Sequence, residues 1–281
     1  MPKTQIIGYP SLHKQGSVES LDASLTSRSA LSVLRPWSAI SGVTHGFLGR
    51  TGGVSEGLFA TLNLSGMVGD SAEAVEENWR RARQFIGAAT QVAMVRQVHG
   101  NTVHVVTRES AKARPAGDGM VTAQRGVVLG VLSADCVPIL MIDAKAQVAG
   151  AFHAGWRGVL AGIARTGLSA MLSVGASLSR IRVALGPSIG PCCFEVDVEL
   201  ANRFACEVEG AAAHRREGRP GKAYLDLRAI ITEQLLRAGL RPDAITHAGP
   251  CTRCAAREYF SRRAAGGAVT GLQLSFVGFE P

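Results

Sequence analysis

Apolar residues in this chain gather in short runs that glycine, proline and polar residues separate. The longest run, 127–142, is broken by Ser133 and Asp135, so it predicts two buried strands and not a membrane span. Pro138 indicates that the second of these strands is an edge strand or carries a bulge. Short β-branched and aromatic runs predict further strands. The predicted strands are 43–48, two within 92–106 joined by a tight turn at 99–101, 126–132, 137–142, 147–152, 181–185, 245–248 and 272–279.

Helical periodicity marks four other segments. The clearest begins at Asp70, which we expect to be the N-cap with Glu73 in a capping box, and ends before Gly87. The predicted helices are 70–86, 156–172, 197–208 and 227–238, and the Arg-, Ala- and Gly-rich segment 210–221 is expected to be a surface excursion. Strands and helices are mixed without strict alternation. This pattern favours an α/β (α+β) sandwich with mixed β-sheets flanked by helices, in one domain over 37–281 after an N-terminal arm over 1–36.

Composition narrows the class of protein. The chain has 281 residues, of which 46% are hydrophobic and 19% charged, as expected of a globular protein. Its net charge of +8 comes from scattered basic residues without interleaved aromatics, which favours a solvated basic surface, with attraction of a small anion such as phosphate as the alternative, and no nucleic-acid partner. Six cysteines in a chain of this length, with no signal or transit peptide, predict a cytoplasmic protein with reduced thiols and no membrane partner. The oligomeric state stays unknown at this stage.

The most informative chemistry lies at strand ends. His99 and His153 each follow a predicted strand, and Cys136 interrupts the longest apolar run. Two imidazoles and one thiolate suit zinc and leave a fourth position open for water, as in catalytic zinc sites. Two alternatives stay open: Cys136 as a nucleophile with His153 as its base, its pKa lowered by Arg157 or a helix N-terminus, or Cys136 as a buried structural thiol.

Other residues are candidates for substrate contact. Arg50 lies in a glycine-rich loop, 49–55, that can bind an anion, and Arg157 lies at the start of a predicted helix, where anions are also favoured. Asn63 is a polar residue in an apolar stretch and is either a turn residue or a substrate contact. Cys251 and Cys254 form a CxxC pair, which alone is half of a structural zinc site or an incidental pair.

Five motifs occurring in order resemble the YfiH-like family, also called the laccase-domain or polyphenol oxidoreductase family. They are Gln97-Val98-His99-Gly100, Gly117-Asp118-Gly119, Ser133-Ala134-Asp135-Cys136-Val137-Pro138, His153-Ala154-Gly155-Trp156-Arg157-Gly158 and Gly186-Pro187-Ser188-Ile189-Gly190. The resemblance covers about residue 43 to the C-terminus. It implies a YfiH-like sandwich, related to folds labelled cysteine hydrolases. It also implies a zinc-dependent purine nucleoside enzyme, a transferase and hydrolase that phosphorolyses adenosine, inosine and methylthioadenosine and deaminates adenosine.

Carried over by the resemblance, the metal ligands are His99, Cys136 and His153, and Arg50 is a catalytic residue that acts through phosphate. For deamination, Asp135 is a candidate proton relay, or it only orders the Cys136 loop. The chain departs from the family near its C-terminus, where Thr270-Gly271 is followed by Leu272 and not by the usual arginine. The role of that arginine is therefore open in this chain.

Several rival functions stay open, the first and third implied by the resemblance and the others by the residues themselves. They are a peptidoglycan-precursor editing hydrolase, a hydrolase with a cysteine nucleophile, a polyphenol copper oxidoreductase of the laccase type, and a metal-stabilised binding protein without turnover. A multicopper oxidase needs a histidine-rich cluster, and two of the seven histidines, His13 and His214, lie in the arm and the Arg-rich segment. Zinc is therefore expected over copper, with a nucleoside and phosphate as the small-molecule partners.

Overall fold

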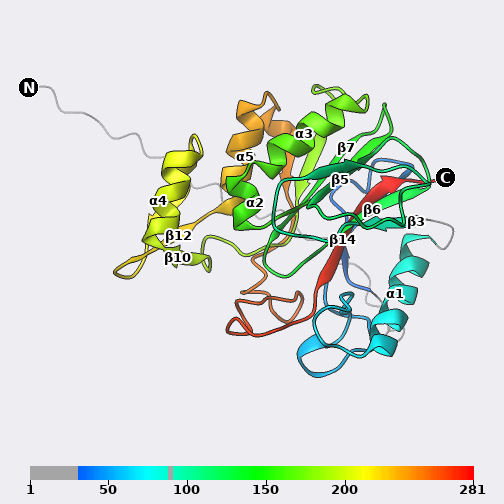
Figure 1. Cartoon of the computed structure of the whole chain (residues 1–281), viewed down its shortest axis with the longest axis horizontal. Coiled ribbons are helices and arrows are strands. Elements are labelled where there is room, and N and C mark those ends of the chain that lie inside the picture. The colour runs from blue at the N-terminus through cyan, green and yellow to red at the C-terminus, as the bar shows by residue number, and fades with distance from the viewer. Residues whose placement is uncertain (1–30, 88–90) are drawn as a thin grey trace, which may run out of the picture.

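The computed structural model describes residues 31–87 and 91–281, which form two packed β-sheets with helices on their outer faces (Figure 1). The first sheet has the order β1-β2-β14-β6-β3. Its strands are β1 (Val33–Leu34), β2 (Val43–Leu48), β14 (Gln273–Phe279), β6 (Val127–Ser133) and β3 (Gln91–Met94). All neighbours in it are antiparallel except β3 and β6, which are parallel. The sheet is therefore mixed, as predicted.

The second sheet has the order β13-β9-β7-β8-β5-β4. Its strands are β13 (Ile245–His247), β9 (Arg182–Leu185), β7 (Val137–Asp143), β8 (Val148–Ala154), β5 (Gly119–Thr122) and β4 (Val103–Val105). The outer pairs β13–β9 and β5–β4 are parallel and the inner pairs are antiparallel. A small third sheet, β10-β12-β11, comprises β10 (Glu195–Asp197), β12 (Lys222–Leu225) and β11 (Arg215–Glu217).

Five α-helices and three short 3₁₀ helices occur in the described residues. They are α1 (Ala72–Ile86), α2 (Trp156–Leu160), α3 (Ile163–Ser173), α4 (Val198–Glu207) and α5 (Leu227–Arg237), with η1 (Gly57–Phe59), η2 (Ala211–His214) and η3 (Pro242–Ala244). Within the described part of the chain, no helix has the length and apolarity that crossing a bilayer requires.

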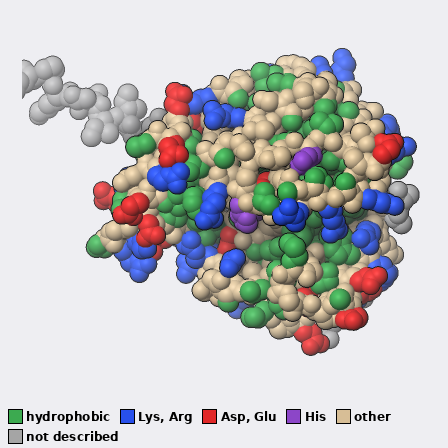
Figure 2. All heavy atoms as spheres, viewed as in Figure 1, with side chains coloured by type: hydrophobic (Ala, Val, Ile, Leu, Met, Phe, Trp, Pro, Cys, Tyr) green, Lys and Arg blue, Asp and Glu red, His purple; other side chains and the backbone are tan. Residues whose placement is uncertain are grey.

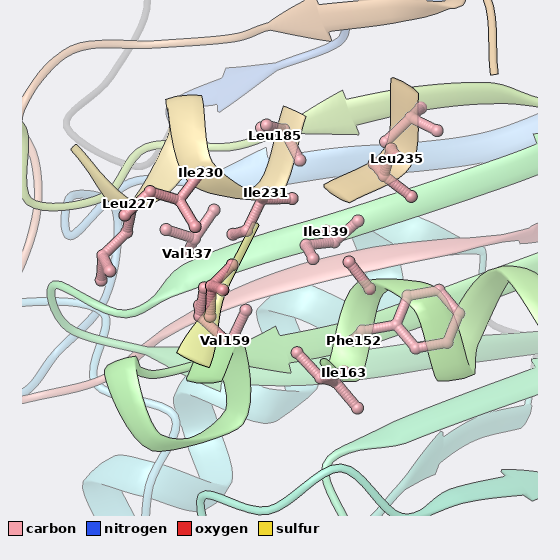
Figure 3. Packing of buried hydrophobic residues seen from close by; sticks show 14 of the residues in the cluster. Val137, Ile139, Phe152, Val159, Ile163, Leu185, Leu227, Ile230, Ile231 and Leu235 are labelled. Atoms are coloured by element: carbon pink, nitrogen blue, oxygen red, sulfur yellow. The ribbon is translucent and has the colours of Figure 1, made fainter. Parts of the chain in front are cut away.

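The strand β7 is apolar from Val137 to Ile142 because both of its faces are buried. Val137, Ile139 and Met141 face the helices, where they join a core with α2, α3 and α5 (Figure 3). Leu140 and Ile142 point the other way and pack against the first sheet. A strand buried on both faces has no need of the alternation that a half-exposed strand shows.

The outer face of the first sheet is covered by α1, whose Val75, Trp79, Ala82 and Ile86 pack on that sheet. The layers are thus α1, the first sheet, the second sheet, and then α3 with α5. The predicted α/β sandwich of mixed sheets flanked by helices is confirmed.

Several predicted details were wrong. The N-cap of α1 is Ser71, whose hydroxyl accepts a hydrogen bond from the N–H of Ala74, and Asp70 instead accepts from Ser55 and Asn63. Segment 92–106 is not a hairpin, because β3 and β4 belong to different sheets. Pro138 lies in an interior strand, near its start and before the pairing with β9 begins at Ile139.

Two more corrections concern helices and loops. The predicted helix 156–172 is two helices, since Gly162 adopts a left-handed φ of 79° between α2 and α3. The segment 210–221 is not a plain excursion, because it forms η2 and β11, which pairs with β12. In the predicted arm, residues 1–30 lie outside the described residues, and β1 pairs with β2.

Candidate metal centre

Two strand connections and the end of one strand bring His99, Cys136 and His153 together. Cys136 lies where the chain passes from β6 in the first sheet to β7 in the second, and His153 lies near the end of β8. His99 lies in the connection between β3 and β4, with a left-handed φ of 60°. One ligand atom from each of the three residues lies within 4.8 Å of the others, and the two imidazole rings meet edge to face with centroids 4.9 Å apart. The three predicted ligands therefore form one cluster.

Asp118 accepts hydrogen bonds from two of these residues, His99 and His153. Its buried carboxylate accepts hydrogen bonds from the N–H groups of Val98, His99 and Gly100, at 3.1, 2.9 and 2.7 Å. It also accepts a hydrogen bond from Nδ1 of His153 at 2.9 Å. Because Nδ1 carries the proton, Nε2 of His153 is the nitrogen left for a ligand. This role of Asp118 was not predicted from the sequence, in which its only signal is the Gly117-Asp118-Gly119 motif.

The electrostatics of the cluster favour the thiolate form of Cys136. Burial alone would raise the pKa of the thiol, but the His153 and His99 rings beside it lower that pKa to about 6. Burial would lower the pKa of His153, whereas Cys136 and Asp118 raise it to about 9. Thiolate is the form of cysteine that binds metals, and a metal on Nε2 displaces the proton that His153 otherwise holds.

Glycines in the segment after β8 leave room for this cluster. A Cβ on Gly155 would lie 2.9 Å from Cδ2 of His99 and 3.1 Å from Sγ of Cys136. A Cβ on Gly158 would lie 2.8 Å from the carbonyl oxygen of Gly100. The His-Ala-Gly-Trp-Arg-Gly motif therefore supplies the ligand His153, and its glycines leave space for His99 and Cys136 to approach closely.

The cluster lines a pocket of about 960 Å³. Apolar residues from α1, the first sheet and the segment before β14 form much of its wall, including Trp79, Leu132 and Leu272. Four exposed arginines also line it, and within the described part of the chain none of them has a carboxylate ion-pair partner. They are Arg83, Arg96, Arg114 and Arg262. Figure 2 shows Lys and Arg side chains along the middle of one face, with His side chains among them.

Arg50, predicted to bind phosphate, lies elsewhere. Its guanidinium donates hydrogen bonds to the carbonyl oxygens of Ala60 and Ala256, both at 2.7 Å, and stacks over the ring of Phe260. It is absent from the pocket lining. In the described structure Arg50 therefore connects two loops through hydrogen bonds to their backbone carbonyl groups.

Asn63 was predicted to be either a turn residue or a substrate contact, and it lies outside the pocket lining. Its side chain is fully buried, with donors bonded to Ser65 and Asp70 and its oxygen accepting from the N–H groups of Ser65 and Leu272. An amide whose donors and acceptor lone pairs are all used has none to offer a substrate.

Arg157 and Asp135 also lie outside the pocket lining. The exposed Arg157 guanidinium stacks on the ring of Trp156. Asp135 accepts hydrogen bonds from the Thr252 hydroxyl at 2.6 Å and from the N–H of Arg263 at 2.7 Å. These contacts hold Asp135 at its left-handed φ of 89° and so order the backbone beside Cys136. These contacts fit the alternative in which Asp135 only orders the Cys136 loop and is not a proton relay.

The donor set fits one ion and does not fit a multicopper cluster. Two imidazoles and one thiolate bind either zinc or copper. Among the described residues, no other histidine joins His99 and His153 in a metal-ligating group. A trinuclear copper centre needs many more histidines at one place, so these residues do not fit one.

The two-sheet fold and the His-Cys-His cluster on a pocket wall define an α/β sandwich protein with a candidate metal site. Residues 44–280 match the family model described as "Multi-copper polyphenol oxidoreductase laccase", and the chain belongs to this family. The family expected from the five motifs is therefore confirmed.

Relatives with similar sequences carry a different description. The chain is 38% identical over 228 residues to a purine nucleoside phosphorylase of Streptomyces griseus, which covers 80% of this chain and 90% of the relative. It is 36% identical over 251 residues to the purine nucleoside phosphorylase YlmD of Geobacillus stearothermophilus, covering 85% and 90%.

Solved structures show the same fold. The crystal structure of YlmD from Geobacillus stearothermophilus has a TM-score of 0.81 at 34% identity, covering 87% of this chain and 94% of that one. The hypothetical protein YfiH of Bacillus licheniformis has a TM-score of 0.82 at 28% identity, covering 92% and 98%.

Proposed function

We propose that this protein is a zinc-dependent purine nucleoside enzyme. Its reactions would be phosphorolysis of adenosine, inosine and methylthioadenosine, and deamination of adenosine. The observation that carries the proposal is the His99, Cys136 and His153 cluster on the wall of an arginine-lined pocket. The names of relatives at 36–38% identity support the nucleoside part of it.

The pocket suits both substrates of a phosphorolysis. Its volume of about 960 Å³ lies in the range of small-molecule sites, and its apolar wall suits a purine and a ribose. The exposed arginines Arg83, Arg96, Arg114 and Arg262 supply positive charge for phosphate. They would replace Arg50 as the phosphate site, because Arg50 is bonded to backbone carbonyls outside the pocket.

In phosphorolysis, a phosphate oxygen forms a bond to C1′ of the sugar as the bond from C1′ to the purine nitrogen breaks. The electron pair of that bond leaves with the purine, which takes up a proton, and the products are ribose 1-phosphate and the free base. The role of the arginines is to hold the phosphate against the sugar. Their positive charge also reduces the repulsion between the negative phosphate and the negative charge that develops on the leaving purine.

His99, Cys136 and His153 would hold the zinc ion, which when bound supplies positive charge and Lewis acidity at the pocket wall. Asp118 keeps the His153 ring fixed through Nδ1 and keeps the His99 backbone fixed through its N–H. In deamination, water replaces the amino group at C6 and ammonia leaves, so the same wall would face the purine edge.

The direct test is an assay of purified, zinc-loaded protein with adenosine, in the presence and absence of phosphate. We expect adenine and ribose 1-phosphate only when phosphate is present, and inosine as an initial product under both conditions. The Cys136→Ala protein should form none of these products, whereas Cys206→Ser should retain activity because Cys206 is exposed and outside the cluster. Absence of all three products from zinc-loaded wild-type protein would contradict the proposal.

A second candidate is a hydrolase in which Cys136 attacks the substrate directly. The observation in its favour is the line of contacts from Cys136 to His153 to Asp118, which is the order of a nucleophile, a base and the group that orients the base. The presence of His99 beside the same sulfur favours a metal, since a nucleophile needs no second imidazole. A chelator separates the two, because activity that survives complete zinc removal would support the nucleophile.

A further inference from the structure

A second group of cysteines lies outside the pocket and has no part in the proposed reaction. It consists of Cys192, Cys193, Cys251 and Cys254, whose four sulfurs all lie within 4.8 Å of one another. Cys193 and Cys251 are buried, while Cys192 and Cys254 are exposed. Two loops supply them, the one after β9 and the one after β13, and these two strands are parallel neighbours.

The distances between the sulfurs fit a tetrahedral metal ion. Sγ of Cys254 lies 3.7 Å from Sγ of Cys192 and 3.5 Å from Sγ of Cys193. Four sulfurs at about 2.3 Å from a zinc ion at the centre of a tetrahedron lie about 3.8 Å apart. A disulfide instead requires a separation of about 2.05 Å. The observed spacing is therefore that of ligands around one ion.

Two groups beside the cluster, the N–H of Gly190 and the guanidinium of Arg253, stabilise thiolates at the sulfurs they contact. The N–H of Gly190 donates a hydrogen bond to Sγ of Cys251 at 3.2 Å. A Cβ on Gly190 would lie 3.2 Å from Cβ of Cys251 and 3.4 Å from Sγ of Cys192, so this loop approaches the cluster closely because it has a glycine there. The guanidinium of Arg253 lies against Cys193 and offsets part of the negative charge that four thiolates bring.

We propose that Cys192, Cys193, Cys251 and Cys254 bind one structural zinc ion. The CxxC pair supplies two ligands at the spacing usual for zinc sites, and the adjacent pair at 192–193 supplies the other two. Four protein ligands leave no open position, so the ion ties loops together and takes no part in catalysis. This site does not depend on the nucleoside proposal.

The ion also has a structural link to the pocket. Thr252 lies between the two cysteines of the CxxC pair, and its hydroxyl donates a hydrogen bond to Asp135 at 2.6 Å. The N–H of Thr252 donates to the carbonyl oxygen of Ser188 at 3.0 Å. Since Asp135 precedes Cys136, the zinc would hold the loop that orders this part of the His-Cys-His cluster.

Metal analysis of four full-length proteins tests the proposal. We expect about two zinc equivalents per chain in the wild type and in the control Cys206→Ser, and about one in Cys254→Ser and in Cys136→Ser. Thermal unfolding of Cys254→Ser should occur at a lower temperature than that of Cys206→Ser, because only the former loses a metal that ties two loops. One zinc equivalent in the wild type with none lost in Cys254→Ser would overturn the proposal, and iron in place of zinc would overturn the choice of metal.

Two measurements keep the proposal testable if Cys254→Ser does not fold. Cobalt-loaded Cys136→Ser protein should show a thiolate-to-cobalt band in the near ultraviolet, and absence of that band would contradict the site. Wild-type protein unfolded without reductant should present all six cysteines to a thiol reagent. A result two thiols short would show a disulfide in place of the metal.

Discussion

At the scale of single residues, the candidate metal centre depends on Asp118 as much as on the three ligands. One carboxylate accepts hydrogen bonds from three consecutive N–H groups, 98–100, and from Nδ1 of His153. It therefore sets both the position of the His99 backbone and the tautomer of His153. The candidate ligands could be predicted from the sequence because imidazoles and thiols suit metals by their chemistry. Asp118 could not, because an aspartate between two glycines is also typical of an ordinary turn.

Replacing Asp118 by Asn should weaken zinc binding at this cluster about 10–100-fold, because the amide is neutral and offers fewer acceptor positions. The measurement is zinc competition against a chromophoric chelator, with the site identified as the zinc that Cys136→Ala protein fails to bind. Asp143→Asn is a matched control, since Asp143 is an equally buried carboxylate that accepts from Ala146, Ser177 and Arg180 far from the pocket. Equal zinc affinity of Asp118→Asn and Asp143→Asn would show that Asp118 has no positioning role.

At the scale of elements, most strands and helices followed from apolar periodicity, and the connections between them did not. The prediction of 43–48 as a strand matches β2, and 272–279 differs from β14 by one residue. The hairpin predicted over 92–106 was wrong, because a Gly-Asn turn signal cannot tell a hairpin from a crossing between two sheets. That crossing is what places His99 beside Cys136, so the convergence of the cluster was only a hypothesis until the strands were paired.

The junction between β8 and α2 carries a prediction at this scale. Gly155→Ala should reduce zinc affinity at the His-Cys-His cluster by about tenfold or more, because the new Cβ would force His99 or Cys136 to move. Gly66→Ala is the control, since a Cβ there meets nothing within 4 Å and the backbone is not left-handed. The same zinc competition measures both, and wild-type affinity in Gly155→Ala would mean that the close approach is not needed.

At the scale of the whole molecule, the two-sheet sandwich and the family were both predicted from the sequence. The layers follow from strands such as β7, which is apolar on both faces because helices cover one face and the first sheet covers the other. The residues that line the pocket could not be predicted from the sequence. Arg83 and Arg262 reach it from positions far apart in the sequence, and Arg50, which the glycine-rich loop favoured, is bonded to carbonyl groups elsewhere.

The stability of the whole fold should depend on the neutral form of His45. Nε2 of this buried ring accepts a hydrogen bond from the N–H of Trp37 at 3.0 Å, and Nδ1 lies 3.2 Å from the carbonyl oxygen of Val43. Burial, together with the charge of Arg35, holds the pKa of His45 below its ordinary value of 6.5, although the Val43 carbonyl opposes this. Between the lowered value and 6.5 the unfolded chain binds more protons, so stability is complete above pH 6.5 and falls as pH decreases below it.

This pH dependence is measured by denaturant unfolding from pH 7 down to about pH 5. The wild type should lose more free energy of unfolding over this interval than His45→Gln, whose amide accepts the Trp37 N–H at every pH. Parallel curves for the two proteins would contradict the role of His45. The comparison cancels the carboxylates, which both proteins share.

The zinc content of wild-type and Cys136→Ala protein is the most direct test of the central claim, that His99, Cys136 and His153 hold one metal ion at the wall of the pocket. We predict that the mutant binds about one zinc equivalent fewer per chain than the wild type and that it remains folded. Equal zinc content in the two folded proteins would show that Cys136 is not a metal ligand and would contradict the account.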